Sequence, residues 1–159
     1  MSNPMNSTPL KPQPSLLTSA EDVTPWPVEV IAYTDGASRG NPGPASLGIY
    51  VTDRAANVVE EYGEKLGHQT NNFAEYTAVL RALQLGSQRG ARRIHLRSDS
   101  ELMVKQMTGV YKVKSPVILP LVAECRAWMK KFESVTFEHV RREFNRDADR
   151  LANEALNKG

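Results

Sequence analysis

The sequence predicts an α/β domain with a five-stranded mixed sheet, in which the first three strands are antiparallel and helices cover both faces. Two observations lead to this fold class. Three short segments rich in apolar and β-branched residues come first and are separated only by loops, as is typical of antiparallel strands. Later strand-like segments alternate with segments whose apolar residues recur every three or four positions, as in amphipathic helices. Hairpin strands followed by helix-separated strands indicate a mixed sheet covered by helices.

The individual elements follow from local patterns, in the order βββ-α-β-α-α-β-α. The three leading strands are expected at residues 28–34, 45–52 and 58–65. A loop rich in Gly, Pro and Asn is expected over 36–44. Phe73, Tyr76 and Leu80 share one face of a helix expected over 71–88, and Gly90 lies just beyond its end. The remaining strand, two helices, strand and helix are expected at 93–97, 100–108, 116–132, 135–140 and 145–157.

Composition excludes several functional classes. The chain has 159 residues, so one domain with a substantial core is expected. A net charge of +2 excludes a polycationic binder of nucleic acids. The one cysteine, Cys125, excludes a disulfide framework and a zinc site built on several thiolates. No apolar run approaches the roughly 18 residues of a membrane span, and no secretion signal is recognisable. We therefore expect a cytoplasmic monomer without a membrane partner.

A change in composition near residue 27 predicts the domain organisation. Residues 1–27 contain six of the ten prolines and no glycine. They show no apolar periodicity, so burial cannot offset the entropy lost on ordering them. We expect a disordered Pro-rich tail over 1–27 and a folded domain over 28–159.

Four acidic residues occupy positions that the topology can bring together. Asp35 and Asp99 directly follow the first and fourth strands, which a helical crossover makes parallel neighbours. Ligands of such sheets bind beyond the carboxyl ends of the strands. Glu75 is expected in the first turn of the helix before the fourth strand, and Asp149 in the second turn of the last helix. Oxygen ligands without His or Cys indicate Mg²⁺ or Mn²⁺.

Each acidic residue also has a structural explanation when it is taken alone. Asp35-Gly36 is a common tight-turn dipeptide. Residues 98–101 fit a helix capping box, and the segment ending at Glu75 follows the same logic. Asp149 lies between two arginines and fits a solvated helix charge. Turns and caps do not require four acids to converge, so their convergence in space would favour the metal site.

Four motifs in order resemble the type 1 ribonucleases H. The motifs are YTDGASRGNPGP, TNNFAE, RSDS and NRDADRLA, at residues 33–44, 70–75, 97–100 and 145–152. The resemblance spans about residues 28–156 and implies a ribonuclease H-like fold, with 28–159 as the catalytic domain. It implies that two divalent ions are held by four acids, among which Asp35 bridges the ions; the four are Asp35, Glu75, Asp99 and Asp149. The implied reaction is endonucleolytic hydrolysis of the RNA strand of RNA–DNA hybrids, leaving 5′-phosphate and 3′-hydroxyl ends.

The resemblance also implies how the substrate is recognised. Thr70 matches a residue that grips a phosphate of the DNA strand. The residues expected to sense the 2′-hydroxyl, which distinguishes RNA from DNA, are Gly36, Ser38, Asn41, Asn71 and Asn72. The loop that carries the first three is also a strong turn sequence on its own.

The sequence departs from better-known members of the family in two places. Many members carry a basic, Trp-rich insertion where this chain has only residues 109–114. Lys112 and Lys114 are either a remnant of it or an ordinary solvated turn. Many members also have a mobile histidine before the last helix, and here residues 141–144 contain none. Arg142 and Glu143 are the auxiliary candidates to replace it.

Two other functions remain open at this point. One is a DNA-acting nuclease of the same fold, against which Asn71, Asn72 and the glycine loop argue. The other is a hybrid-binding module with weak or lost catalysis. An intact acidic quartet argues against the second, because clustered carboxylates repel one another. A module that did not need them would only lose stability by keeping them.

Overall fold

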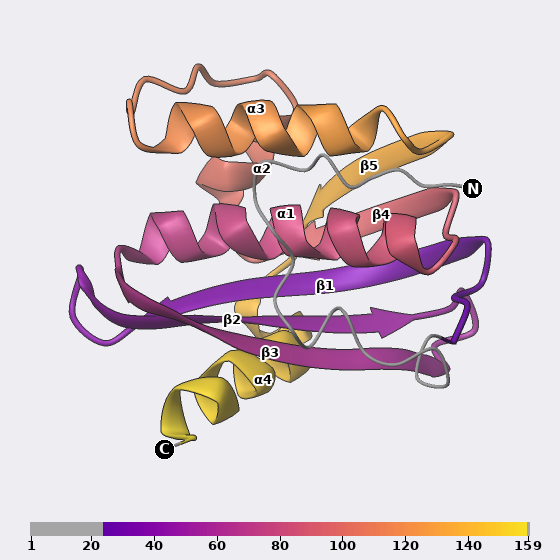
Figure 1. The fold of residues 1–159 in the computed structure, drawn as a ribbon, viewed down its shortest axis with the longest axis horizontal. Helices are drawn as coiled ribbons and strands as arrows, with labels where there is room; N and C mark the ends of the chain where they lie inside the picture. Colours follow the sequence, from indigo (N-terminus) through magenta and orange to yellow (C-terminus); the bar gives the residue numbers. More distant parts are fainter. Residues whose placement is uncertain (1–23, 159) are drawn as a thin grey trace.

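A computed structural model describes residues 24–158, which form one five-stranded mixed sheet with strand order β3-β2-β1-β4-β5 (Figure 1). Strand β1 pairs antiparallel with β2, and β2 pairs antiparallel with β3. Strands β4 and β5 continue the sheet in parallel on the other side of β1. The bounds are β1 Glu29–Ser38, β2 Gly43–Thr52, β3 Val58–Gln69, β4 Arg93–Ser98 and β5 Ser134–His139. The fold class predicted from the sequence is confirmed.

Helices cover both faces of the sheet. Helix α1 lies along one face with α3 stacked on it, and α4 lies on the opposite face (Figure 1). The bounds are α1 Asn71–Gln88, α2 Glu101–Met107, α3 Ile118–Met129 and α4 Arg146–Asn157, with a 3₁₀ turn at Arg142–Phe144. The main core lies between α1 and the sheet, where Leu80, Leu83 and Ile49 are fully buried. Among residues 24–158, no helix has the length and apolar character needed to cross a membrane.

Strand β1 is longer than the sequence predicts. Residues 36–38, expected in a loop, continue the strand and pair with β2, from Gly36 opposite Leu47 to Ser38 opposite Ala45. Gly, Ala and Ser have little preference for strands, so no local pattern marks the extension, and pairing with β2 stabilises it. The parallel pairing with β4 ends at Thr34. Asp35 therefore lies where β1 still pairs with β2 but no longer pairs with β4.

Helix α4 approaches the sheet closely because β2 has small residues beneath it. A Cβ atom at Gly48 would overlap the carbonyl oxygen of Ala148. The Ser46 hydroxyl donates a buried hydrogen bond of 2.5 Å to the carbonyl oxygen of Ala152. The first turn of α4 is thereby held against the middle of the sheet.

The folded part begins before residue 28. Residues 1–23 of the predicted tail lie outside the described residues, but Trp26 is buried. Its backbone N–H donates to the carbonyl oxygen of Arg89 at 2.8 Å, and its indole N–H donates to Glu60 at 3.2 Å. Arg89 also pairs with Glu60 at 3.1 Å. The sequence did not predict the burial of Trp26, because Trp26 lies between two prolines and its partners are distant in the sequence.

Candidate active site

Asp35 and Asp99 lie side by side at the carboxyl edge of the sheet. Thr34 pairs with Ser98 in the parallel ladder of β1 and β4, so the next residue of each chain segment is an aspartate at the same level. Asp35 is 8% exposed, and Asp99 is half-buried. The end of the two parallel strands thus presents two carboxylates to one pocket, as the topology predicts.

Helix α1 brings Glu75 to the same pocket. Glu75 lies in the second turn of α1, one turn later than the sequence suggests. Gly36 makes this approach possible, because a Cβ atom there would overlap the backbone nitrogen of Glu75. The carboxylate oxygens of Asp35, Glu75 and Asp99 lie within 4.8 Å of one another. Gly36 therefore has a packing role that its place in a turn-like motif does not reveal.

Helix α4 adds the fourth acid, and Asn145 holds the start of this helix against β1. Asp149, in the first turn of α4, hydrogen-bonds with the carboxyl group of Asp35. The Asn145 side-chain amide donates a buried hydrogen bond of 3.0 Å to the carbonyl oxygen of Thr34. Its backbone carbonyl accepts from the N–H of Asp149 at 3.1 Å. Asn145 thus connects the residue before Asp35 directly to the turn that carries Asp149.

The four acids repel one another in a partly dehydrated pocket. Burial and the charges of Asp99, Asp149 and Glu75 raise the pKa of Asp35 from 3.8 to about 8. Burial and the charge of Asp99 raise the pKa of Glu75 from 4.5 to about 7, although Ser100 and Arg142 oppose the increase. Cations in the pocket would relieve this repulsion. The donors are all carboxylate oxygens, the ligand type that suits Mg²⁺ and Mn²⁺.

The loop between β1 and β2 is tied to the start of α1. The Asn41 side-chain oxygen accepts from the backbone N–H of Asn71 at 3.0 Å. The Ser38 hydroxyl contacts the carbonyl oxygens of Gly40 and Gln69, the latter at 2.9 Å. This loop therefore sits in a fixed position next to the carboxylates.

The predicted substrate residues of α1 surround its first turn. Thr70 is the N-cap, and its hydroxyl accepts from the N–H of Phe73 at 3.1 Å. The Asn71 side-chain amide lies 3.4 Å from the carboxylate of Glu75. Asn72 is half-buried in the same turn. The structure thus gathers all six predicted substrate residues at the end of β1, on the β1–β2 loop and at the adjoining end of α1.

Comparisons with known proteins agree with this geometry. Residues 33–155 match a family model described as reverse transcriptase-like. The chain is 42% identical over 127 residues to ribonuclease HI of Halobacterium salinarum, covering 80% of this chain and 64% of that protein. The crystal structure of RNase H1 from Halobacterium salinarum matches with a TM-score of 0.80 and 41% identity, covering 82% of this chain and 99% of that one. The chain belongs to the type 1 ribonuclease H family.

A second solved family member is bound to an RNA/DNA hybrid. LC11-RNase H1, solved in complex with an RNA/DNA hybrid, matches with a TM-score of 0.76 and 41% identity, covering 80% of this chain and 96% of that one. The chain spans less than two thirds of the length of the curated Halobacterium ribonuclease HI.

The auxiliary candidates lie on the 3₁₀ turn before α4. Arg142 and Glu143 are both exposed. The positive charge of Arg142 opposes the rise in the pKa of Glu75, so its guanidinium is close enough to act on the carboxylates electrostatically. Glu143 instead pairs with Arg141 at 3.2 Å. Of the two, Arg142 has the better position to act on a bound phosphate.

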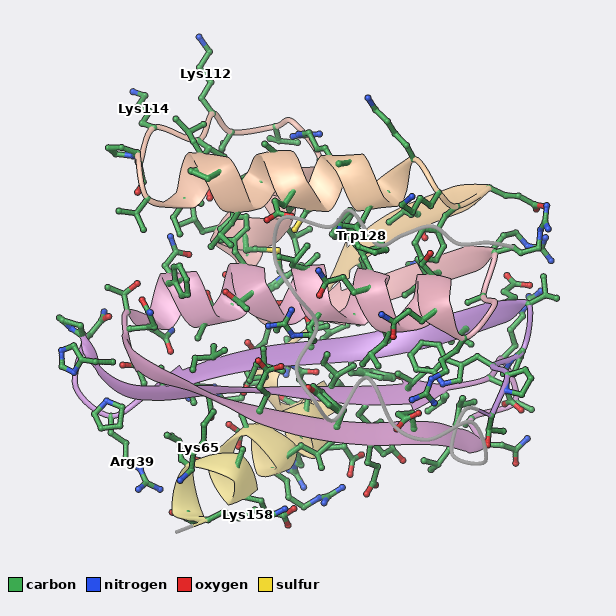
Figure 2. The ribbon with its side chains drawn as sticks, in the orientation of Figure 1. Arg39, Lys65, Lys112, Lys114, Trp128 and Lys158 are labelled. Carbon is green, nitrogen blue, oxygen red and sulfur yellow. The ribbon has the colours of Figure 1, made fainter. Side chains whose placement is uncertain are left out.

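The segment in place of the family's basic insertion is a short exposed connection. Lys112 and Lys114 lie at the far side of α3 from the sheet, beyond α1 (Figure 2). Tyr111 packs under the ammonium group of Lys105, 5.2 Å from the ring centroid. The two lysines form no ion pair with any residue in 24–158.

Sequence reasoning missed two residues that shape the site. Asn145 was predicted only as the first residue of the last helix, and Ser100 only as a helical residue after a cap at Ser98. A buried amide that bonds to a carbonyl 111 positions away leaves no local pattern, so only the coordinates reveal its role. Ser100 itself caps α2, accepting from the N–H of Met103 at 3.2 Å, and its hydroxyl also hydrogen-bonds to Glu75.

Proposed function

We propose that the chain is a metal-dependent endoribonuclease that hydrolyses the RNA strand of RNA–DNA hybrids and leaves 5′-phosphate and 3′-hydroxyl ends. The main support is that the carboxylate oxygens of Asp35, Glu75 and Asp99 gather within 4.8 Å beside the glycine loop. The substrate class follows from the family, in which LC11-RNase H1 has been solved with an RNA/DNA hybrid.

The acids would hold two Mg²⁺ or Mn²⁺ ions, with Asp35 between them. Support comes from the all-oxygen donor set and from the mutual repulsion that raises the pKa of Asp35 to about 8. When bound, two such ions lower the pKa of the attacking water and neutralise charge on the leaving 3′ oxygen. Glu75, Asp99 and Asp149 would complete the ligand set from three further elements. Arg142 would contact the scissile phosphate, in place of the missing histidine.

Recognition of the RNA strand would fall to the end of β1, the β1–β2 loop and the start of α1. Ser38, Asn41, Asn71, Asn72 and the backbone of Gly36 would sense the 2′-hydroxyl, which can both donate and accept hydrogen bonds. The hydroxyl of Thr70 already accepts from Phe73, and its own proton remains available to a phosphate of the DNA strand.

A cleavage assay tests the proposal directly. A labelled RNA–DNA hybrid, duplex DNA and duplex RNA are incubated with the protein across titrations of Mg²⁺ and Mn²⁺. We expect cleavage of the hybrid RNA alone, only with a divalent ion, and products with 5′ phosphates. Equal cleavage of duplex DNA would support the DNA-acting nuclease. Metal-stimulated binding of the hybrid without cleavage would support the catalytically inactive module.

We also propose that the protein acts in the cytoplasm as a monomer. The buried thiol of Cys125 is compatible with a reducing compartment. Light scattering after gel filtration should give a mass near 17.7 kDa, and a mass of twice that value would overturn the monomer.

A further inference from the structure

Three cations from separate elements meet at one corner of the molecule. Arg39 lies on the β1–β2 loop, Lys65 on β3 and Lys158 just beyond α4. All three are exposed, and Figure 2 shows them together at the lower left, near the end of α4. Unlike most arginines of residues 24–158, none of the three takes part in an ion pair there. We call these residues the basic corner.

Contacts with α4 hold the basic corner together. The guanidinium of Arg39 donates to the side-chain oxygen of Asn157, the residue before Lys158. Lys65 and Lys158 line the same open groove of about 550 Å³ between β3 and α4. The three positive groups thus lie together at the C-terminal end of α4.

The acids of this groove pair with another arginine, Arg150, and neither of them forms an ion pair with Lys65 or Lys158 among the described residues. Glu61 and Glu154 line the groove. The Arg150 guanidinium lies 3.0 Å from Glu61 and 3.4 Å from Glu154. Arg150 offsets one of these two negative charges, so the three cations of the basic corner outnumber the acid charge that remains in the groove. An unpaired cluster of this kind is the electrostatic signature of a phosphate-binding surface.

The basic corner continues the surface where the substrate is proposed to bind. Arg39 directly follows Ser38 and lies two residues before Asn41, both proposed to contact a ribose. A duplex that places its RNA strand on this loop would carry its next phosphates toward Arg39 and the end of α4. Such contacts position a duplex without reading its sequence.

We propose that Arg39, Lys65 and Lys158 bind the phosphate backbone of the hybrid beyond the carboxylate pocket. This inference rests on the proposed function, since it extends the same binding surface. It gives a chain with a net charge of only +2 a local source of phosphate affinity.

Salt-dependent binding tests the inference. The triple variant Arg39→Gln/Lys65→Gln/Lys158→Gln and the parent bind a fluorescent hybrid in EDTA, and anisotropy is followed across a KCl titration. Each lost phosphate contact lowers the slope of log K against log salt by nearly one, so the slope should fall by about two to three. At low salt, affinity should fall about tenfold or more. Duplex DNA should show a similar fold loss, because phosphates are common to both duplexes.

A matched control separates local contacts from net charge. The control Arg126→Gln/Lys130→Gln/Lys131→Gln removes the same charge from exposed positions at and after the end of α3, on the far side of α1. It should keep a slope much closer to the parent. Equal losses in the two triple variants would overturn the inference.

A single substitution and the cleavage assay complete the test. Lys65→Gln alone should lower the slope by about one without changing the melting temperature, because Lys65 makes no hydrogen bond or ion pair in the described part of the chain. An unchanged slope would contradict its phosphate contact. A parent that binds but does not cleave the hybrid would overturn the proposed function. A parent that cleaves, with a basic-corner variant that binds equally well, would overturn only the inference.

Discussion

Two carboxyl groups in this protein are equally buried and have opposite surroundings. Asp35 and Glu64 are each 8% exposed. Glu64 accepts two hydrogen bonds from Arg81, at 2.7 and 2.9 Å, and a third from Tyr62 at 2.9 Å. Asp35 has three other carboxylates as its charged neighbours. Of these two buried acids, only Glu64 has a cationic partner that compensates its charge.

The difference separates an acid with a structural role from one that is proposed to bind metal. Arg81 also contacts Gln84 at 2.6 Å, so the charge of Glu64 is enclosed in a complete network between β3 and α1. Such a network gives no reason for a ligand to bind. The uncompensated charge around Asp35 instead disfavours the folded state until cations arrive. Burial alone does not mark an acid as a candidate for catalysis, whereas burial among other acids without a cationic partner does.

The largest expected effect comes from removing the uncompensated acid. Asp35→Asn takes away the proposed bridging ligand with little change in volume, so kcat for hybrid cleavage should fall by about a thousandfold or more. Single-turnover cleavage at saturating Mg²⁺ measures this loss. The metal-free variant should also be more stable than the parent at pH 8, because one repelling charge is gone.

The control for this variant is a substitution of Asp147, which lies in α4 together with Asp149. Asp147→Asn removes an exposed acid that pairs with Arg150 at 3.4 Å, and it should retain cleavage within about twofold. Normal turnover in Asp35→Asn would contradict the proposed ligand role.

The second largest effect comes from removing the partner of the compensated acid. Arg81→Met leaves the charge of Glu64 buried without its ion pair, which typically costs about 3–5 kcal/mol of unfolding free energy. Urea denaturation measures the loss. The remaining folded protein should cleave the hybrid at the parent's rate, because Arg81 lies outside the carboxylate pocket.

An exposed arginine provides the comparison for this substitution. Arg150 forms ion pairs with Glu61, Asp147 and Glu154, yet all of these groups reach solvent. Arg150→Met should therefore cost about 1 kcal/mol or less. Similar losses for the two arginines would mean that burial does not strengthen the Arg81 pair.

The third prediction concerns pH. The folded-state pKa of Asp35, about 8, lies above the 3.8 expected of an unfolded chain. Its contribution to stability is therefore fully present below pH 4 and is lost as pH rises toward 8. Between pH 4 and pH 8, the melting temperature of the metal-free parent should fall more than that of metal-free Asp35→Asn. The difference between the two isolates the contribution of Asp35. Mg²⁺ should raise the melting temperature more at pH 8 than at pH 6, because it competes with protons for the same oxygens. An equal Mg²⁺ effect at the two pH values would contradict this coupling.

Much of this comparison could be foreseen from the sequence, and part of it could not. Asp35 and Asp99 were expected together because strand order and parallel pairing follow from local patterns and short connections. The Glu64–Arg81 pair was not expected, because the two residues lie 17 positions apart on different elements and no helical or strand periodicity connects them. Gly36 appeared as a turn residue, since no sequence pattern reveals that α1 crosses it too closely for a Cβ atom. Features set by contact between distant elements need coordinates.

The smallest expected effect tests how the pocket keeps its fourth acid. Asn145 is 1% exposed, and its side-chain oxygen lacks a hydrogen-bond partner within the described residues. Asn145→Asp replaces the amide that bonds to Thr34 with an oxygen, so a carboxylate would face a carbonyl and move the first turn of α4. We expect kcat to fall about tenfold and the Mn²⁺ concentration for half-maximal activity to rise. The loss of a buried hydrogen bond should lower the unfolding free energy by about 1–3 kcal/mol.

The metal dependence distinguishes positioning from general destabilisation. Asn57→Ala breaks a side-chain bond to Asp53 in the distant β2–β3 turn, and it should lower stability without changing the Mn²⁺ requirement. If Asn145→Asp also leaves that requirement unchanged, Asn145 only stabilises the fold. A raised requirement shows instead that a neutral amide keeps Asp149 beside Asp35, where an ion pair such as Glu64–Arg81 would have cancelled the charge proposed to bind the metals.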